Sequence, residues 1–188
     1  MLYVETYDMQ TVDWKCDGRL DHLRTFIKEG QIGNTTIISP AFARLALSNP
    51  YNKNKQWKIR HLGTSVQFNA SDHGLITVGP QAYFGDNCVL YASGSKITIG
   101  EHLKMAPGSA VYASYHDTFD KNLTVKGEVR IGDSVWLAQN AVVLRGVTIA
   151  DNCTVGANSV VTKSFLEPYS VIAGNPAKLI KIATEGHE

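Results

Sequence analysis

The sequence predicts an all-β protein built on a parallel β-helix, and three observations indicate this fold. Within residues 127–166, aliphatic side chains recur at every sixth position. The position after each is often glycine or alanine, and the position two before each is small or β-branched. Three such hexapeptide repeats form one triangular coil, with the aliphatic side chains pointing inward. The recurring residues are Ile131, Leu137, Val143, Ile149, Val155 and Val161.

Small side chains follow four of these six aliphatic residues. We expect them to let the chain turn each corner of the coil without a Cβ clash. Coils of this kind stack at roughly 4.8 Å, the spacing of neighbouring β-strands. Each coil is therefore expected to satisfy the backbone hydrogen bonds of the next. The four residues are Gly132, Ala138, Ala150 and Gly156.

Residues 1–60 lack the six-residue register and are predicted to form an N-terminal cap over the open end of the solenoid. The cap is expected to be partly helical, because residues 21–30 (DHLRTFIKEG) place apolar side chains on one helical face and end in glycine. Residues 31–39 could form a strand or an isolated coil.

The β-helix is predicted to span residues 61–166, with two interruptions. About three extra residues break the register at 93–96, and a longer interruption covers about 114–127. An insertion on a flat face would break the stacking, so we expect the longer segment to leave the prism as a loop at a corner. Loops on rigid scaffolds often carry chemistry. Residues 167–188 are predicted to be a C-terminal extension that closes the last coil.

Composition narrows the function classes. The 188 residues carry a net charge of +1 and no basic stripe, which argues against nucleic acid as a partner. The apolar runs are too short to span a bilayer, and the first ten residues lack the pattern of a signal peptide. Three cysteines, without a CxxC pair, indicate a reducing, cytoplasmic setting. Cys88 and Cys153 fall at inward positions and are expected in the core.

His116, in the loop SYHDTFD, is the strongest candidate for a catalytic group. Imidazole, whose ordinary pKa in model peptides is about 6.5, is a suitable general base; a solvated loop histidine is the alternative. Asp117 could orient the imidazole, as could a backbone carbonyl or an acid from a neighbouring subunit. Trp136 holds the last place of its hexad, so its indole should point outward, toward a substrate, a cofactor or the next subunit.

Three segments give the chain a family resemblance: IGDSVWLAQNAVVLRGVTI, VGANSVVTK and AGNPAKLIK. They resemble the bacterial hexapeptide-repeat acetyltransferases of the sugar O-acetyltransferase type, including the galactoside, maltose, colanic-acid and capsule enzymes. The loop containing His116 is most similar to the colanic-acid type. The resemblance covers residues 76–182. It implies a left-handed single-stranded β-helix and a homotrimer that binds acetyl-CoA as co-substrate between subunits.

The resemblance also implies which residues line the cofactor channel. Small residues would let the pantetheine arm lie along the coils, and lysines could meet the CoA phosphates as point charges. Corner packing explains the alanines equally well, and a solvated face explains the last two lysines. The implied residues are Trp136, Ala138, Gln139, Ala157, Thr162, Lys163, Lys178 and Lys181.

The acceptor is less well specified by the resemblance. The segment YASGSKITIG is shorter than its counterpart in the galactoside enzymes and lacks the asparagine that holds the sugar there. This difference favours a polysaccharide or nucleotide-sugar acceptor over a small galactoside.

We therefore expect an acetyl-CoA-dependent O-acetyltransferase acting on a hydroxyl of a sugar or glycan precursor. Direct transfer is expected, because no Gly-x-Ser-x-Gly nucleophile motif is present. One alternative is N-acetylation of an amino sugar or xenobiotic. Two others are a zinc protein like the γ-carbonic anhydrases, using His73, His102 and His116, and a non-catalytic scaffold. No metal is predicted.

Overall fold

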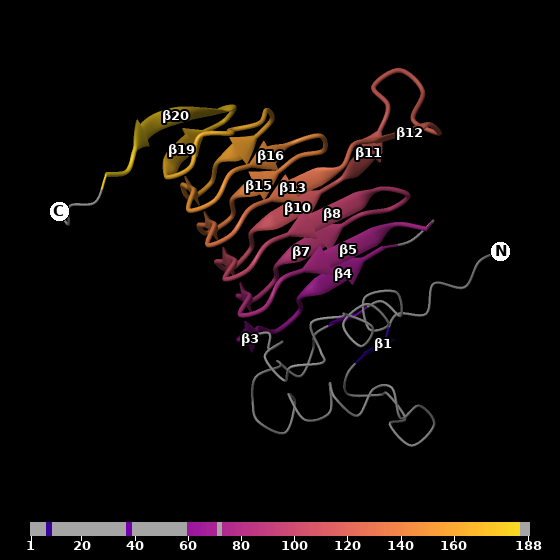
Figure 1. Ribbon diagram of the computed structural model, residues 1–188. Helices are drawn as coiled ribbons and strands as arrows, with labels where there is room; N and C mark the ends of the chain where they lie inside the picture. Colours follow the sequence, from indigo (N-terminus) through magenta and orange to yellow (C-terminus); the bar gives the residue numbers. More distant parts are fainter. Residues whose placement is uncertain (1–6, 9–36, 39–59, 71–72, 185–188) are drawn as a thin grey trace.

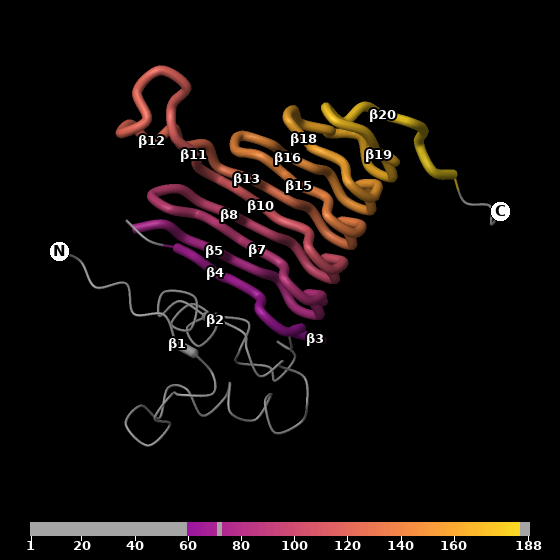
Figure 2. The backbone as a smooth tube through the Cα atoms, turned by 180° about the vertical axis from the view of Figure 1, so that it is seen from behind, coloured from indigo at the N-terminus to yellow at the C-terminus, as the bar shows by residue number. Residues whose placement is uncertain are grey.

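The computed structural model describes residues 7–8, 37–38, 60–70 and 73–184 (Figure 1). These residues form strands and turns, with no helix among them, and wind into a parallel β-solenoid of five coils. The predicted all-β parallel β-helix is confirmed. Figure 2 shows the same coils stacked in order from the purple β3 (His61–Leu62) to the yellow C-terminal strands. No helix able to cross a bilayer occurs in this described part of the chain.

Each coil contributes one strand to each of three sheets, which we name A, B and C. Sheet A contains, in spatial order, β1 (Tyr7–Asp8), β2 (Ile37–Ile38), β4 (Gln67–Asn69), β7 (Val89–Tyr91), β10 (Ala110–Tyr112), β15 (Val142–Val143) and β18 (Val160–Val161). Sheet B contains β3 (His61–Leu62), β6 (Tyr83–Phe84), β9 (Lys104–Met105), β14 (Trp136–Leu137), β17 (Thr154–Val155), β19 (Ser170–Gly174) and β20 (Ala177–Ile182). Sheet C contains β5 (Leu75–Val78), β8 (Lys96–Ile99), β13 (Val129–Ile131) and β16 (Thr148–Ile149), and Phe165 extends it through a bridge to Ile149.

The two ends of the solenoid differ from the middle. β2 lies parallel to β4 and extends sheet A by one strand, whereas β1 runs antiparallel to β2. A strand is thus one of the two forms expected for residues 31–39. The rest of the predicted cap, including its helix at 21–30, lies outside the described residues. At the other end β20 turns back antiparallel on β19 and ends sheet B.

The core consists of the predicted aliphatic column and a second column beside it. All six recurring aliphatic residues between 131 and 161 are at most 3% exposed. The residues two positions before them are buried as well, which leaves space inside the prism only for small or β-branched side chains there. Cys88 and Cys153 occupy such positions, and burial raises the pKa of both thiols. Their predicted place in the core is confirmed, while Cys16 lies outside the described residues.

The corners differ from the prediction. At the corners that flank sheet B, the backbone turns through positive φ three residues before the inward aliphatic residue, not directly after one. Asparagine often holds this place, as at Asn140, Asn152 and Asn158 (φ 55–59°). Asparagine adopts this conformation more readily than most residues. The glycine after the aliphatic residue has a different role: a Cβ on Gly132 would lie against Oδ1 of Asp151 and 2.8 Å from the Asp151 nitrogen. Coil stacking, rather than turning, requires small residues there.

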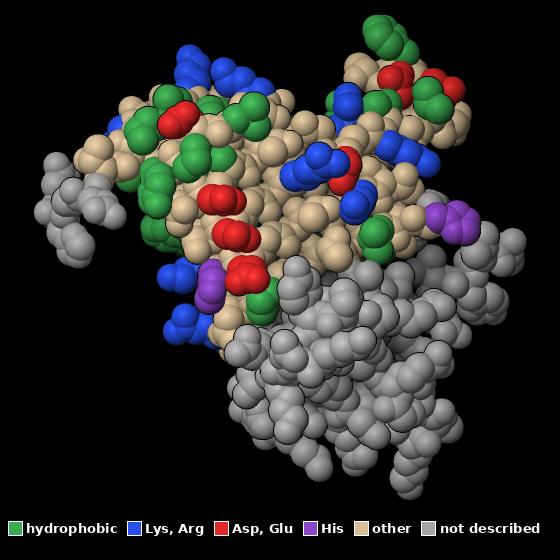
Figure 3. Space-filling view, in the orientation of Figure 1, with side chains coloured by type: hydrophobic (Ala, Val, Ile, Leu, Met, Phe, Trp, Pro, Cys, Tyr) green, Lys and Arg blue, Asp and Glu red, His purple; other side chains and the backbone are tan. Residues whose placement is uncertain are grey.

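Aspartates at the corners bind amides of the preceding coil. Asp151 Oδ1 accepts the backbone N–H of Asp133 (2.8 Å), and Asp133 Oδ1 accepts that of Glu101 (2.8 Å). At another corner Asp86 Oδ1 accepts the Thr64 N–H (2.7 Å) and hydroxyl (2.9 Å), and these bonds lower the pKa of Asp86. Figure 3 shows acidic side chains aligned in a column along one corner. These bonds satisfy amides that the strand ladders leave unpaired.

Every interruption of the register falls at one corner. The extra residues lie between β4 and β5, between β7 and β8, and between β10 and β13, which are the first three passages from sheet A to sheet C. The corners that flank sheet B carry none in these coils. The A/C corner is therefore the side of the solenoid on which chain length can vary without disturbing the stacked strands.

Substituting Gly132 by alanine should destabilise the protein, because the new Cβ must displace the Asp151 backbone of the next coil. We expect a loss of about 1–3 kcal/mol, seen as a melting temperature lowered by roughly 2–10 °C. Gly146→Asn is the matched control, because a Cβ at Gly146 would meet open space. Gly146 has φ 76°, and asparagine holds the equivalent left-handed position at Asn140, Asn152 and Asn158. That variant should melt close to the unsubstituted protein; equal losses in both would contradict the stacking explanation.

Candidate functional site

His116 lies on a hairpin that projects from the A/C corner. The hairpin consists of β11 (Ser114–His116) and β12 (Thr124–Lys126), paired antiparallel with His116 opposite Thr124. Figures 1 and 3 show it standing clear of the coils. The His116 side chain is exposed, and no hydrogen bond to its imidazole is present among the described residues. The ring is therefore displayed outward and available to another molecule.

The base of the hairpin is held firmly on the solenoid. The Gly127 N–H donates to the Ala113 carbonyl (2.9 Å), which closes the strand pair at its root. The Arg145 guanidinium lies over the Tyr115 ring, 4.5 Å from its centroid, and such cation–π contacts are stabilising. Ser114, the first residue of β11, is buried. His116 follows two residues later, so these contacts fix where its backbone stands.

Asp117 ties the tip of the hairpin. Its Oδ1 accepts the backbone N–H groups of Phe119 (2.8 Å) and Asp120 (3.1 Å), and these bonds hold the pKa of Asp117 below its usual range. The Lys121 ammonium donates to the carbonyls of Asp117 and Thr118. This carboxylate oxygen is thus directed into the turn.

A second group of side chains forms a column on the outer face of sheet B. Strand pairing places His61, Tyr83, Lys104, Trp136 and Thr154 directly above one another on successive coils. Trp136 is 48% exposed, and its indole points outward as predicted. The column joins three aromatic rings and one cation on an otherwise flat surface.

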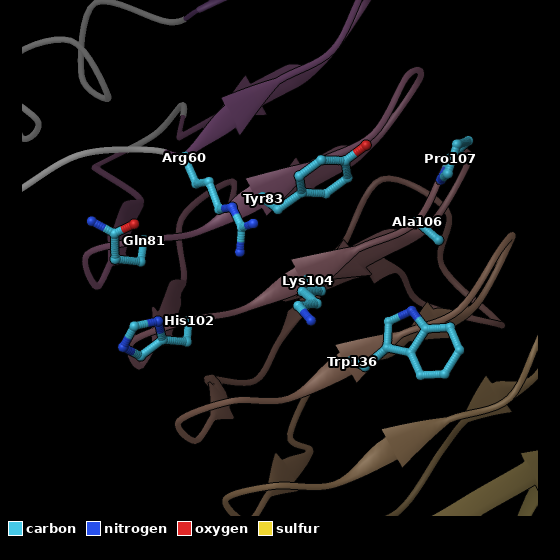
Figure 4. Close-up of a pocket in the computed structure, with 8 residues that line it drawn as sticks. All are labelled: Arg60, Gln81, Tyr83, His102, Lys104, Ala106, Pro107 and Trp136. Atoms are coloured by element: carbon cyan, nitrogen blue, oxygen red, sulfur yellow. The ribbon is translucent and has the colours of Figure 1, made fainter. Parts of the chain in front are cut away.

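This column forms one wall of a pocket of about 410 Å³. The volume falls within the range of small-molecule sites. Figure 4 shows Tyr83 and Trp136 on either side of Lys104, with Arg60 reaching across from the first coil. The His61 ring stacks on Tyr83 with centroids 4.6 Å apart, which supports the tyrosine from behind. The lining residues are Arg60, Gln81, Tyr83, His102, Lys104, Ala106, Pro107 and Trp136.

The residues implied for the cofactor channel divide between the two sides of the prism. Those on the side of sheet B are Trp136 on β14, Ala138, Gln139 and Ala157 at the B/A corner, and Lys178 and Lys181 on β20. Thr162 and Lys163 lie at the A/C corner, as does the hairpin with His116 and Asp117. Ala138 is buried, while Gln139 and Ala157 are exposed.

Within one chain these two groups do not meet. A triangular prism places the A/C corner opposite sheet B, so the hairpin points away from the pocket formed by the same chain. A reaction that uses both must take the hairpin from one copy of the chain and the sheet B face from another.

Sequence analysis missed Arg60, Tyr83 and Lys104 as site residues. The signal for two of them was present, because Tyr83 and Lys104 hold the same outward place in their hexads as Trp136. Reading that place down the coils, rather than for Trp136 alone, would have found the column. Arg60 directly precedes β3, and nothing in the register indicates it.

The histidines considered for zinc are dispersed in this chain. His73 and His116 lie on the A/C corner, whereas His102 lies on the C/B corner. Within residues 60–70 and 73–184, no group of three or more His, Cys, Asp or Glu side chains is placed to hold a metal ion.

Comparison with known proteins agrees with the repeat and the fold. Residues 128–163 match the family model described as "Bacterial transferase hexapeptide (six repeats)". The chain is 38% identical over 112 residues to a protein of Escherichia coli K12 assigned as the colanic acid biosynthesis acetyltransferase WcaF. That match covers 58% of this chain and 60% of the relative. The chain thus spans less than two thirds of the relative's length.

Two solved structures are also similar. A maltose O-acetyltransferase from Clostridium difficile superposes with a TM-score of 0.54 at 26% identity, covering 97% of this chain and 94% of that chain. A hexapeptide-repeat acetyltransferase from Vibrio cholerae, solved in complex with acetyl-CoA, gives 0.57 at 24% identity, covering 90% and 92%. Repeat, topology and these similarities together show that the chain is a hexapeptide-repeat protein with the fold of the bacterial hexapeptide-repeat acetyltransferases.

Proposed function

We propose that this protein is an acetyl-CoA-dependent O-acetyltransferase that acts in the cytoplasm on a sugar or glycan precursor. The observation that carries the proposal is the exposed imidazole of His116, held on a rigidly rooted hairpin. The similar proteins named as colanic acid and maltose acetyltransferases support the reaction class. The structure complexed with acetyl-CoA supports the acetyl donor.

The chemistry assigned to His116 is proton transfer. Acetyl-CoA supplies the acetyl group as a thioester, and a hydroxyl becomes a sufficient nucleophile only as it loses its proton. The free ring nitrogen of His116 takes that proton as the hydroxyl attacks, and the resulting imidazolium returns a proton to the departing sulfur. This sequence needs no acyl-enzyme, in keeping with the burial of Cys88 and Cys153.

We further propose that the site is shared between subunits of a homotrimer. Rotation about an axis parallel to the solenoid keeps every coil at the same height. The hairpin leaves the third coil, so it would meet a neighbour near its third and fourth coils, the level of Lys104 and Trp136. Closed rotational symmetry of this kind is usual for homo-oligomers. The two groups of residues that are separated in one chain would then form one site.

The donor would lie on the C-terminal side of Trp136. From there Ala138, Gln139 and Ala157 form a corner with little side-chain bulk, along which a pantetheine arm could run. Lys178 and Lys181 on β20 of one subunit, and Thr162 and Lys163 of its neighbour, are placed to meet the phosphates at the far end. All three lysines are exposed, as point charges for phosphate must be.

Replacing His116 by alanine should lower kcat by about two to four orders of magnitude, the usual contribution of a general base. Acetyl-CoA affinity should change little, because the imidazole acts on the acceptor's proton. Steady-state kinetics with matched hydroxyl and amine acceptors measure this effect and also separate O- from N-acetylation. His73→Asn, on the same corner, is the control and should keep full activity. Undiminished turnover by the His116 variant would refute its role as the base.

Mixing two inactive variants tests the shared site. Co-expressed His116→Ala and Trp136→Ala chains should form some sites from an intact hairpin and an intact sheet B face. If chains assort at random in a closed ring, about a quarter of the sites are of this kind, and activity should recover to roughly that fraction. Activity no higher than that of the separate variants would mean that both residues act within one chain.

For Asp117 we propose a role in tying the hairpin tip rather than in orienting the imidazole. Asp117→Ala removes the acceptor of the Phe119 and Asp120 N–H groups, whereas Asp117→Asn keeps an oxygen in its place. Amide hydrogen exchange across residues 114–126 should quicken roughly fivefold in the alanine variant, the effect of about 1 kcal/mol. It should stay unchanged in the asparagine variant. Equal activity losses in both variants, without faster exchange, would instead favour an orienting carboxylate.

A further inference from the structure

We propose that the pocket on sheet B binds an anionic sugar, so that the acceptor carries a phosphate or carboxylate group. This inference rests on the proposed function and specifies its substrate class. It begins with the charge of the lining residues. Arg60 and Lys104 both line the pocket, and neither forms an ion pair in the described part of the chain. No carboxylate lines the pocket.

The aspartates nearby are engaged in hydrogen bonds with backbone amides, and the exposed Glu101 carboxylate forms no ion pair with any described residue. Glu101, Asp133 and Asp151 belong to the corner column, where the two aspartates each accept a backbone N–H of the coil below. Asp86 is held by the amide and hydroxyl of Thr64. The positive charge in the pocket therefore has no counter-ion from the described residues and is available to a ligand anion.

The rings set the shape of the ligand. Tyr83 and Trp136 each pair with Lys104 on adjacent strands, so their Cα atoms are roughly 10 Å apart, two strand spacings, with the ammonium between them. Aromatic rings with this outward placement offer faces to flat or pyranose rings. A ligand with a ring on each side and an anionic group in the middle matches this order. Figure 4 shows the same sequence of aromatic, cationic and aromatic side chains.

Two sources of such an acceptor share this chemistry. In a nucleoside-diphosphate sugar, the base and the sugar flank a diphosphate. In a glycan with uronic acid units, a carboxylate sits beside neighbouring sugar rings. CoA is also anionic, but the proposal places its nucleotide beyond Trp136, near Lys178 and Lys181, and leaves Arg60 and Lys104 to the acceptor.

The test measures binding without chemistry, so that it does not depend on acetyl transfer. Equilibrium binding of UDP-glucose, a methyl glucuronide and a methyl glucoside would be measured on the full-length protein. The comparison includes Lys104→Met, which keeps the side-chain length without the charge, and Lys104→Arg, which keeps the charge. Lys96→Met removes an exposed lysine from the outer face of sheet C and serves as the control.

We expect one anionic compound to bind at least tenfold more tightly than the glucoside. Lys104→Met should lower the affinity for this anionic compound about ten- to one-hundredfold, which is the range for loss of a hydrogen bond to a charged group. Lys104→Arg should restore most of the affinity, and Lys96→Met should leave it unchanged. Preference for UDP-glucose would identify a nucleotide-linked acceptor, and preference for the glucuronide a uronic acid acceptor.

Two results would overturn the proposal. One is that the glucoside binds as tightly as both anionic compounds. The other is that Lys104→Met lowers the affinity for acetyl-CoA rather than the affinity for the anionic sugar. The proposed acetyltransferase function can be refuted independently of the anion-binding pocket. A protein that binds the anionic sugar but transfers no acetyl group from acetyl-CoA would keep the pocket assignment and refute the acetyltransferase.

Discussion

The in-register stacking of coils is the constraint on which the other features of this structure depend. Each backbone amide in a strand bonds to the coil above or below, so a residue is always placed over its counterpart one coil away. Side chains therefore form columns: aliphatic inside, mixed outside, and carboxylates along the corners. No residue can be added within a strand without shifting every column at once, so length variation is confined to the corners. Three coils have extra residues at the A/C corner, and the longest of these insertions is the hairpin that carries His116.

The sequence predicted which side chains point into or out of the solenoid, but it did not predict how the corners are built. The inward column and the positions of Cys88, Cys153 and Trp136 follow from counting in sixes, and the structure confirms them. The corner geometry does not, because a glycine looks the same in a sequence whether it turns the chain or admits a neighbouring backbone. Gly132 does the second, while Asn140 and its equivalents do the first. The handedness of the coils comes only from the family resemblance.

The candidate site was harder to predict than the fold, for a physical reason. Its parts lie on opposite sides of one prism, and no spacing rule within a chain brings His116 toward Trp136. The column of Tyr83, Lys104 and Trp136 becomes visible only when insertions are removed and the coils are aligned, since the separations in sequence are 21 and 32 residues. Asp117 shows the opposite difficulty. Adjacent to His116 in sequence, it suggests a partnership, yet its Oδ1 binds the amides of the hairpin tip.

The reversal between β19 and β20 determines how sheet B ends. Five coils present parallel edges, and any further parallel strand, from this chain or from another, could in principle join them in the same register. β20 instead runs antiparallel and carries Lys178 and Lys181, so the exposed edge of sheet B presents a reversed strand with positive charges. On this face, a repeat that could extend indefinitely, as in a fibril, therefore ends at β20. The hairpin of β19 and β20 thus covers the parallel edge of sheet B on which another strand could otherwise pair.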